Sequence, residues 1–373
     1  MKGYYIFVPV DDGVVGEYSG VEKKIRNFCK VLNETIDTEL HIVQRHQINK
    51  SRIMRILIRW MPWTAVGHNW QKMCNNYEDA DFLYIRKAEH DYSFIKFLKE
   101  IKKNNPKIKI LYELPTYPYE GEKKVSVKNF PIYAKDRVFR RMLKKYVDRI
   151  VTFYDQKKIF DIKTISVING YSFNNAKCSI MTYGYDNDIN LIEVSTTAFW
   201  HGYDRMLEGL HLYYKNGGSR NVNFHMVGPI MDEHRKMVSS YSLEKLVILH
   251  GKKSGDELDK IYSKCSIGVD VLGGHRKNYP ISSSLKSREY ADKGMPIITS
   301  SPIDYLPLDY KYQLVCSYDD EPIDIEQIIE FYDTIFKDEL ANGIHDSIYK
   351  FAVQNCDFHE TIKPIISYLQ GRS

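Results

Sequence analysis

The chain has 373 residues, of which 43% are hydrophobic and 27% are charged. This composition is typical of a globular protein long enough for two domains, and it excludes disordered, collagen-like and coiled-coil chains. The 53 basic and 48 acidic residues leave a net charge of +5, an excess too small to favour a nucleic-acid partner.

The six cysteines lie far apart without a Cys-x-x-Cys pair, which argues against a disulfide framework and against a zinc site. The N-terminus lacks the features of a signal peptide, and no run of about 18 apolar residues occurs. We therefore expect a cytoplasmic protein with reduced thiols. The histidines show no spacing typical of metal ligands, so we expect neither a metal nor another cofactor.

In the first half of the chain, short apolar segments alternate with helical patterns. The strand candidates are residues 4–9, 40–43, 82–85, 108–112, 149–153 and 165–168. Apolar residues recur at helical spacing over 21–32, and a second helix is expected over 93–103. Such alternation predicts a parallel sheet, and we expect an acceptor-side, Rossmann-like domain over residues 1–175.

The same alternation restarts in the second half. The strand candidates there are residues 191–195, 222–227, 246–249, 267–271, 296–299 and 314–316. The helix candidates between them are residues 204–215, 254–265 and 285–293. This pattern predicts a second Rossmann-like domain over 176–350, followed by a C-terminal helix in 351–373 that packs back toward the first domain.

The expected fold class is thus α/β, with two doubly wound domains that face a central cleft. Ligands of open α/β sheets bind beyond the carboxyl ends of the strands. Arg86 follows the third strand, and a segment rich in tyrosines and carboxylates follows the fourth, so we assign Arg86, Thr116 and Tyr117 to acceptor binding. Glu113 is the candidate acceptor-side base, and a role in a loop hydrogen-bond network is its alternative.

The most informative segment is residues 282–296, a polar loop that leads into a short helix ending at Gly294. Backbone N–H groups at such a helix start, with Lys286 beside them, can bind a diphosphate. One helical turn later, Glu289 can accept hydrogen bonds from a ribose diol. A capped surface helix with Lys286 in solvent is the alternative interpretation.

Glu289, Gly294 and Pro296 form the pattern Glu-x-x-x-x-Gly-x-Pro, which resembles the nucleotide-sugar site of retaining GT-B glycosyltransferases of family four. Further segments that resemble the family are Ser19-Gly-Val-Glu22, residues 148–152, 167–170, 200–210, 225–228 and 250–251. The resemblance spans about residues 3 to 300 and also implies transfer without a metal ion. The donor-site residues we assign are Gly16, Gly20, His201, Gly202, Arg205, Arg276, Ser284, Leu285, Lys286 and Glu289.

The sequence departs from the family pattern at two informative positions. Ile281 stands where the family has a glutamate eight residues before the one matched by Glu289. His201 stands where the family has a lysine before the glycine matched by Gly202, and the upstream arginine is not evident. Arg205, Arg276 and Lys286 are the expected substitutes in the diphosphate clamp.

The resemblance implies a glycosyltransferase that moves a hexose-type sugar from a nucleoside-diphosphate sugar to a glycan or lipid-linked oligosaccharide in surface polysaccharide biosynthesis, with retained configuration. A sugar-nucleotide epimerase and a non-catalytic partner subunit of a glycosyltransferase are the alternatives. The segment 52–63 and the basic residues within 140–145 can face anionic headgroups, or they can form ordinary solvated helix surfaces. The first of these interpretations implies peripheral contact with the inner face of the plasma membrane.

Overall fold

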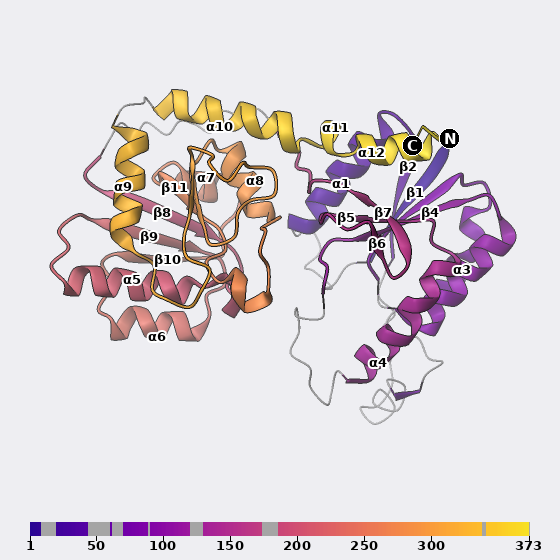
Figure 1. The fold of residues 1–373 in the computed structure, drawn as a ribbon, viewed down its shortest axis with the longest axis horizontal. Helices are drawn as coiled ribbons and strands as arrows, with labels where there is room; N and C mark the ends of the chain where they lie inside the picture. The colour runs from indigo at the N-terminus through magenta and orange to yellow at the C-terminus, as the bar shows by residue number, and fades with distance from the viewer. Residues whose placement is uncertain are drawn as a thin grey trace. The chain divides into compact units, whose positions relative to one another are not determined.

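The computed structural model describes residues 1–8, 20–43, 60–61, 70–88, 90–119, 130–173, 186–337 and 341–372. The chain forms two compact units (Figure 1). Unit 1 comprises residues 1–172 and 358–373, and unit 2 comprises residues 173–357. Each unit is built around a mainly parallel sheet, so the predicted α/β fold with two Rossmann-like domains is confirmed. Among the described residues, no helix is long and apolar enough to cross a bilayer.

The sheet of unit 1 has seven strands in the order β2-β1-β3-β4-β5-β7-β6. The strands are β1 (Lys2–Phe7), β2 (Asp37–Ile42), β3 (Phe82–Arg86), β4 (Lys109–Leu114), β5 (Arg149–Thr152), β6 (Lys158–Ile159) and β7 (Ile162–Ser166). All neighbouring pairs are parallel except the short hairpin of β6 and β7, which the sequence did not predict. The helices are α1 (Gly20–Asn33), η1 (Trp70–Tyr77), α3 (Tyr92–Asn104), α4 (Phe130–Phe139), η3 (Arg140–Lys145), α11 (Phe358–Thr361) and α12 (Lys363–Leu369).

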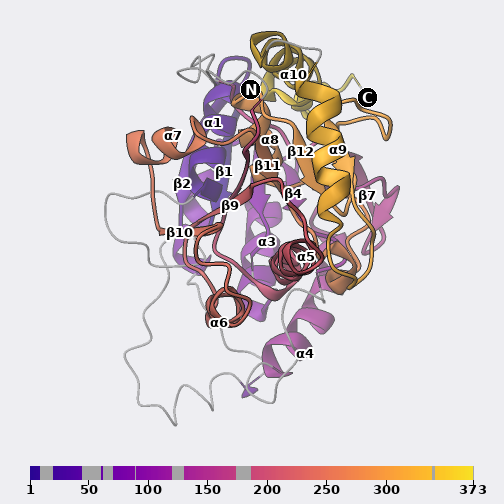
Figure 2. The same ribbon diagram turned by 90° about the vertical axis from the view of Figure 1, so that its left-hand side faces the viewer.

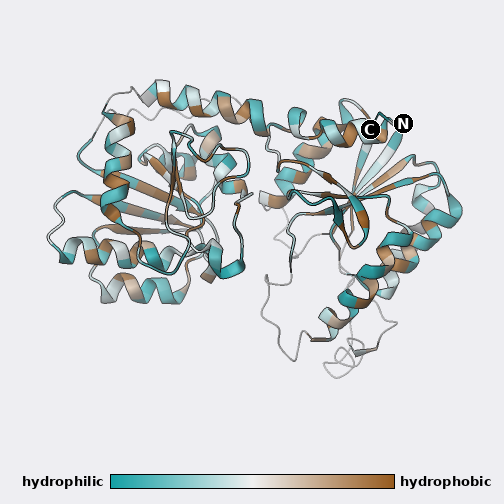
Figure 3. Ribbon diagram, in the orientation of Figure 1, coloured by the Kyte–Doolittle hydropathy of each residue, from teal (hydrophilic) through white to brown (hydrophobic). Residues whose placement is uncertain are grey.

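Strand β1 shows why the sheet of unit 1 is covered on both faces. Successive side chains of a strand point to opposite faces, so Tyr4 and Ile6 enter one core while Tyr5 and Phe7 enter the other. The first core contains the apolar side of α3, and the second contains that of α1. A strand buried on both faces needs a continuous apolar run, which is what residues 4–8 supply, and Figure 3 shows hydrophobic residues concentrated along the strands.

The end of the chain completes the core on the α1 side of unit 1. The ring of Phe358 lies edge-on to that of Phe28 on α1, with centroids 5.7 Å apart. Lys109 Nζ donates hydrogen bonds to the carbonyl oxygens of Tyr368 and Leu369 at 3.2 and 2.7 Å. Residues 358–369 are therefore a structural part of unit 1, although the whole of unit 2 precedes them in the sequence.

The sheet of unit 2 has six parallel strands in the order β10-β9-β8-β11-β12-β13. The strands are β8 (Ile189–Val194), β9 (Val222–Val227), β10 (Val247–Gly251), β11 (Ile267–Val269), β12 (Ile297–Thr299) and β13 (Gln313–Val315). In order along the chain this is the 3-2-1-4-5-6 arrangement of a dinucleotide-binding Rossmann sheet. All six strands agree with the sequence prediction to within a few residues.

The helices of unit 2 cover the sheet between successive strands. They are η4 (Phe199–His201), α5 (Tyr203–Lys215), α6 (Asp232–Ser240), α7 (Asp256–Tyr262), η5 (Gly274–Lys277), α8 (Leu285–Asp292), α9 (Ile325–Phe336) and α10 (Ala341–Cys356). Helix α5 packs against α6 and α9, and Figure 2 shows α5 and α6 side by side. Helix α8 packs against α10, and it is followed by Gly294, whose positive φ of 64° suits the residue that ends a helix.

Candidate functional site

The strand order of unit 2 reverses between β8 and β11, and ligands of open parallel sheets bind beyond the strand ends at such a point. Glu193 lies near the end of β8, and Asp270 comes directly after β11. Both side chains are fully buried. The sequence analysis did not single out either residue, although each is a lone acid within an apolar strand segment, and that is the signal that identifies them.

Asp270 holds the start of α8 at this point. Its Oδ2 accepts a hydrogen bond from Ser282 Oγ and its Oδ1 accepts one from Ser284 Oγ, both at 2.7 Å. Ser284 is the N-cap of α8, and its Oγ also accepts from the backbone N–H of Ser287 at 3.1 Å. The free N–H groups of the first helical turn, which includes Leu285 and Lys286, are thus fixed beside the strand ends of the sheet.

Arg288 donates to the Ser284 carbonyl at 3.1 Å and pairs with Asp304, and Lys286 is a second cation beside these groups. Its Nζ donates a 2.7 Å hydrogen bond to the hydroxyl of Tyr203 at the start of α5, and it lies 3.7 Å from Oδ1 of Asp270. The Lys286 side chain is only 14% exposed, so its charge is screened little by solvent. Glu289 lies one turn further along α8 and is partly exposed. Leu285, Lys286 and Glu289 therefore lie on one short helix, and Ser284 is its N-cap.

Glu193 carries an incompletely satisfied carboxyl group. Its Oε2 accepts a 2.7 Å hydrogen bond from Ser195 Oγ, whereas its buried Oε1 has no hydrogen-bond partner among the described residues. Burial raises the pKa of Glu193 to about 7, and the nearby charge of Lys286 opposes that rise. The carboxyl group therefore changes its charge near neutral pH.

Gly202 allows the η4–α5 turn to contact the loop after β11. Its φ of 70° lies in the left-handed region, and a Cβ at this position would stand 2.4 Å from the backbone nitrogen of Gly273. The backbone N–H of Leu272 donates a 2.7 Å hydrogen bond to the carbonyl of His201 across the same contact. A glycine is thus required at position 202 by both its conformation and its surroundings.

His201 is a neutral histidine. Its Nδ1 accepts a 3.1 Å hydrogen bond from the backbone N–H of Ala198, so the ring proton is carried by Nε2. Burial, together with the charges of Lys286 and Lys277, lowers the pKa of His201 to about 2. His201 therefore does not supply the positive charge that a lysine would place before Gly202, and its role in donor binding stays a prediction.

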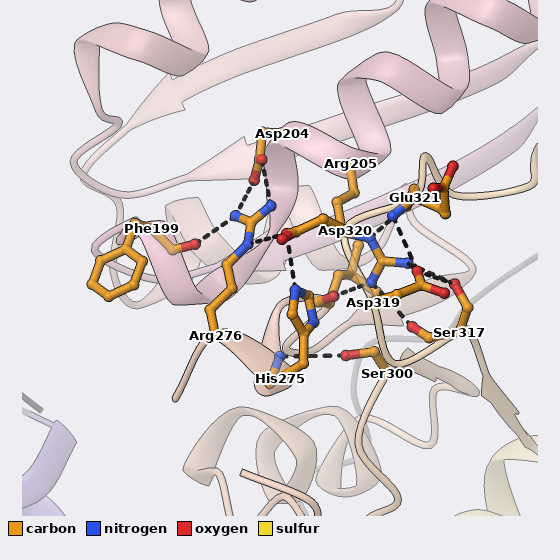
Figure 4. A network of polar contacts seen from close by, with 12 residues as sticks. Phe199, Asp204, Arg205, His275, Arg276, Ser300, Ser317, Asp319, Asp320 and Glu321 are labelled. Atoms are coloured by element: carbon orange, nitrogen blue, oxygen red, sulfur yellow. Dashed lines mark hydrogen bonds and ion pairs between the residues drawn. The ribbon is translucent and has the colours of Figure 1, made fainter. Parts of the chain in front are cut away.

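Arg205 is buried among backbone acceptors (Figure 4). Its guanidinium group donates to the carbonyl oxygens of Leu272, Ser317 and Glu321, to the Ser317 hydroxyl and to the Asp319 carboxylate. These five contacts match the five N–H groups of an arginine. They favour a structural role for Arg205, whose side chain links residues 317–321 to the loop after β11. The predicted contact of Arg205 with the donor stays untested.

Arg276 lies between two carboxylates in the same network (Figure 4). It donates to both oxygens of Asp204 at 2.8 and 2.7 Å, to Asp320 at 2.6 Å and to the carbonyl of Phe199 at 2.7 Å. His275 also contacts Asp320, at 2.8 Å. Hydrogen bonds to Asp204 raise the pKa of Arg276. Its charge is therefore balanced within the protein, and the predicted contact with a diphosphate would have to compete with these two acids.

In unit 1 the strand order reverses between β1 and β3, and Arg86 ends β3. Arg86 forms a buried ion pair with Glu113 of β4, and the hydroxyl of Tyr5 donates a 3.0 Å hydrogen bond to the same carboxylate. Burial opposes ionisation of Glu113, but the charges of Arg86 and Lys24 outweigh it and lower its pKa. A carboxylate held in this way is a weak proton acceptor, so the environment favours the network interpretation of Glu113 over that of a base.

The remaining predicted residues are less constrained. Thr116 and Tyr117 follow β4 and are half-buried, and the ring of Tyr117 lies edge-on to Phe160 at 5.9 Å. Gly20 begins α1, and Gly16 lies outside the described residues. In the described part of the chain, no group of three or more His, Cys, Asp or Glu side chains is placed to hold a metal ion.

Several solved structures with the same fold are glycosyltransferases. A glycosyltransferase from Rickettsia africae aligns with 100% of this chain and 98% of its own, at a TM-score of 0.65 and 11% identity. HepE from Anabaena, solved in complex with UDP-glucose, aligns over 100% of both chains, at a TM-score of 0.60 and 12% identity. WaaG, a glycosyltransferase of lipopolysaccharide biosynthesis, aligns over 100% of both chains, at a TM-score of 0.58 and 10% identity.

At the level of sequence, no protein-family model and no curated protein matches the chain. Identities of 10–12% relate folds and not activities. The agreement nevertheless extends over the full length of the chain and over both of its sheets. The chain therefore has the two-sheet α/β fold of GT-B glycosyltransferases.

Proposed function

We propose that the protein is a glycosyltransferase that takes its sugar from a nucleoside-diphosphate sugar bound by unit 2. The observation that carries this proposal is the position of α8, whose N-terminus is fixed by Asp270 at the point where the strand order reverses. Free N–H groups and the positive end of a helix dipole suit a diphosphate. The fold shared with HepE, which was solved with UDP-glucose, supports a donor of the same class.

In the proposed donor complex, the diphosphate lies against the N–H groups of Leu285 and Lys286. Lys286 is the principal cation, because the guanidinium group of Arg205 is already bound by acceptors within the protein and the ring of His201 is uncharged. Glu289, one turn along α8, accepts hydrogen bonds from the ribose hydroxyls. As the sugar departs, negative charge grows on the phosphate, and a fixed cation and helix N-terminus stabilise it without a metal ion.

We place the acceptor, a glycan or lipid-linked oligosaccharide, on unit 1, where Arg86, Thr116 and Tyr117 follow two central strands. Retention of anomeric configuration is part of the proposal through the resemblance of Glu289, Gly294 and Pro296 to the family-four pattern. Surface polysaccharide biosynthesis is the proposed pathway, because WaaG, which has the same fold, acts in lipopolysaccharide biosynthesis.

Unit 1 also carries a surface suited to an anionic membrane. A basic stripe lies exposed along α4 and η3. It consists of Arg137, Arg141, Lys144 and Lys145, and the exposed Val138 lies among them. The acid within it, Asp136, is turned toward His90 and Tyr119. Exposed Phe130 and Trp60 lie beside the start of α4, with ring centroids 6.3 Å apart. Cations near exposed aromatic residues are typical of peripheral membrane contact. The arginines from which the sequence predicted such contact, Arg52, Arg55 and Arg59, lie outside the described residues.

A binding screen tests the donor site. We expect one class among UDP-, GDP-, dTDP- and ADP-sugars to bind without added metal and to stabilise the protein by about 2.7 kcal/mol at a hundred times its dissociation constant. Glu289→Ala should weaken that binding at least tenfold, whereas Glu330→Ala, an exposed position on α9, should leave it unchanged. If no sugar nucleotide binds, the proposal is wrong, and the non-catalytic partner subunit becomes the better account. Interconversion of the bound sugar without an acceptor would instead identify an epimerase.

A further inference from the structure

The buried acid Glu193 is not used by the proposed function, yet it lies beside the cation that the donor needs. The groups that face it come from three elements. Helix α5 contributes the hydroxyl of Tyr203, and helix α8 contributes Lys286 and Tyr290. Directly after β8, Ser195 Oγ donates to Oε2 of Glu193.

These groups form a chain between two carboxyl groups. Tyr203 lies next to Glu193 and accepts the 2.7 Å hydrogen bond of Lys286, and Lys286 in turn lies 3.7 Å from Asp270. Tyr290 donates to the carbonyl of Val269 at 3.1 Å and accepts from the N–H of Val194 at 3.2 Å, so its hydroxyl is already occupied. Lys286 therefore lies beside Asp270 and close enough to Glu193 for its charge to act on that carboxyl group.

The charge of this cluster depends on a single proton. With Glu193 ionised, Lys286, Asp270 and Glu193 carry a net charge of −1, which repels an anion. With Glu193 protonated, the same three groups are neutral, and the dipole of α8 leaves the site attractive to an anion. A full negative charge on Glu193 is also costly in its own right, because the group is buried and its Oε1 has no partner among the described residues.

We propose that Glu193 is a proton-binding site that couples occupation of the α8 N-terminus by the anionic sugar nucleotide to the uptake of one proton. This inference rests on the proposed function, because it concerns the ligand of the same site. Glu193 acts here as a positioning residue. Its protonation frees Lys286 from one of its two acidic neighbours, so that the ammonium group can turn to the diphosphate.

The expected pH dependence follows from the sign of this coupling. An anion beside Glu193 favours its protonated form, so the bound protein holds the proton to a higher pH than the free protein does. Affinity should be constant while Glu193 is protonated in both states. As pH rises above about 7, affinity should fall by up to about tenfold per pH unit, until the proton is lost from the complex as well.

Calorimetric titration with UDP-glucose, or with the sugar nucleotide chosen by the screen, tests this coupling from about pH 6 to about pH 8.5. A sugar nucleotide is the right probe because its phosphate diesters do not titrate in this range. In the wild-type protein we expect the affinity to fall as pH rises. Titrations in buffers of different ionisation enthalpy should show that binding takes up nearly one proton. Glu193→Gln keeps the size and the contact with Ser195, and it should bind with no pH dependence and more tightly than the wild type at the alkaline end. Glu330→Gln, the matched surface control, should keep the wild-type slope.

A measurement without ligand separates the failure of this inference from the failure of the proposed function. Because folding raises the pKa of Glu193 above its ordinary value of 4.5, the melting temperature of the wild type relative to Glu193→Gln should fall as pH rises from about 4.5 to about 7, and level off above that. A constant difference over that range overturns the proposal whatever the ligand does. Sugar-nucleotide binding with equal pH profiles in both proteins overturns the coupling alone. Absence of binding in both proteins at every pH overturns the donor site, and the coupling with it.

Discussion

Ser284 Oγ donates a 2.7 Å hydrogen bond to Oδ1 of Asp270, and this contact ties the N-cap of α8 to the end of β11. The same Ser284 oxygen accepts from the helix, so one hydroxyl joins the sheet, the loop and the first helical turn. Asp270 is completely buried, and Ser282 donates to its second oxygen. Asp270 therefore shapes the proposed diphosphate site, and Asp304, which accepts from Ser283 and pairs with Arg288, holds the same segment.

Asp270→Ala should destabilise unit 2 and weaken sugar-nucleotide binding together. Two serine hydroxyls lose their acceptor, and each buried group left unpaired costs about 1–3 kcal/mol, so we expect a loss of roughly 2–6 kcal/mol in the free energy of unfolding. Urea denaturation measures this loss. Ser284→Ala removes the cap and one of the two donors to Asp270, while Ser282 keeps its contact, so it should cost less, about 1–2 kcal/mol. An Asp270→Ala protein as stable as the wild type would contradict the anchoring role.

Arg205→Ala should lower stability by about 3–5 kcal/mol, because it leaves the carbonyl oxygens of Leu272, Ser317 and Glu321 without their donor. Arg235→Ala, an exposed arginine on α6, should change stability by less than about 0.5 kcal/mol. Chemical denaturation distinguishes the two variants. If Arg205→Ala keeps its stability but loses sugar-nucleotide affinity, Arg205 contacts the donor, as the sequence predicted.

Glu113→Gln should reduce stability by about 3–5 kcal/mol, because it leaves Arg86 as an unpaired buried cation. Arg86→Met should do the same, and the double variant should be less destabilised than the sum of the two. Because folding lowers the pKa of Glu113, its stabilising contribution is present above about pH 4.5 and is lost as pH falls below it. The difference in stability between wild type and Glu113→Gln should shrink in that acidic range.

A different result for Glu113→Gln would identify a base. A variant that folds with wild-type stability but transfers sugar at least a hundredfold more slowly, with unchanged donor affinity, would support the catalytic assignment made from the sequence. The two outcomes are separated by measuring unfolding and turnover on the same preparation.

Gly202→Ala should destabilise the protein more than Gly217→Ala. Both glycines have positive φ, 70° and 90°, and alanine in this region costs roughly 1–2 kcal/mol. Only at Gly202 does the added Cβ also meet backbone atoms, at 2.4 Å from Gly273, so the loop after β11 must move. Thermal unfolding should rank the variants in this order, and equal effects would show that the contact with Gly273 is loose.

The basic stripe should bind anionic vesicles. Replacing Arg137, Arg141 and Lys145 by alanine removes three charges worth about 1 kcal/mol each near such a surface, so co-sedimentation with phosphatidylserine vesicles should weaken by roughly a hundredfold. Lys144 is left in place because it pairs with Asp161. Alanine at Arg235, Lys236 and Lys245, which are exposed cations of unit 2, provides a control of equal charge. Equal losses in both triple variants would mean that the stripe has no special role.

The fold could be predicted because apolar segments alternate with helices at a regular spacing in both halves of the chain. The strand segment 267–271, for example, is recognisable from its apolar residues although it contains Asp270. Helices α4 and α9 were not predicted. The sequence of α4 separates polar from apolar residues only weakly, and α9 follows a loop and a strand, β13, of only three residues. Local patterns determine the element type, whereas boundaries depend on tertiary contacts.

The arrangement of the candidate site residues could be predicted only where they lie close together in the sequence. Ser284, Lys286 and Glu289 follow one another on a helix, and their spacing alone brings them together. The environments of Arg205 and Glu113 depend on partners far along the chain, at Ser317 and Arg86, which no spacing rule reveals. A lone acid in an apolar strand segment marks Glu193 in the sequence, but its second property, an oxygen without a partner among the described residues, exists only once the sheet has formed.

The docking of α12 against β4 has a consequence for how the protein is made. Residues 358–369 close the core on the α1 side of unit 1, yet they are synthesised after all of unit 2. Unit 2 is contiguous in the sequence, so it can fold before residues 358–369 are made, whereas the aromatic core around Tyr5, Phe28 and Tyr84 is completed only after them. The half of the protein that is made first is thus completed last.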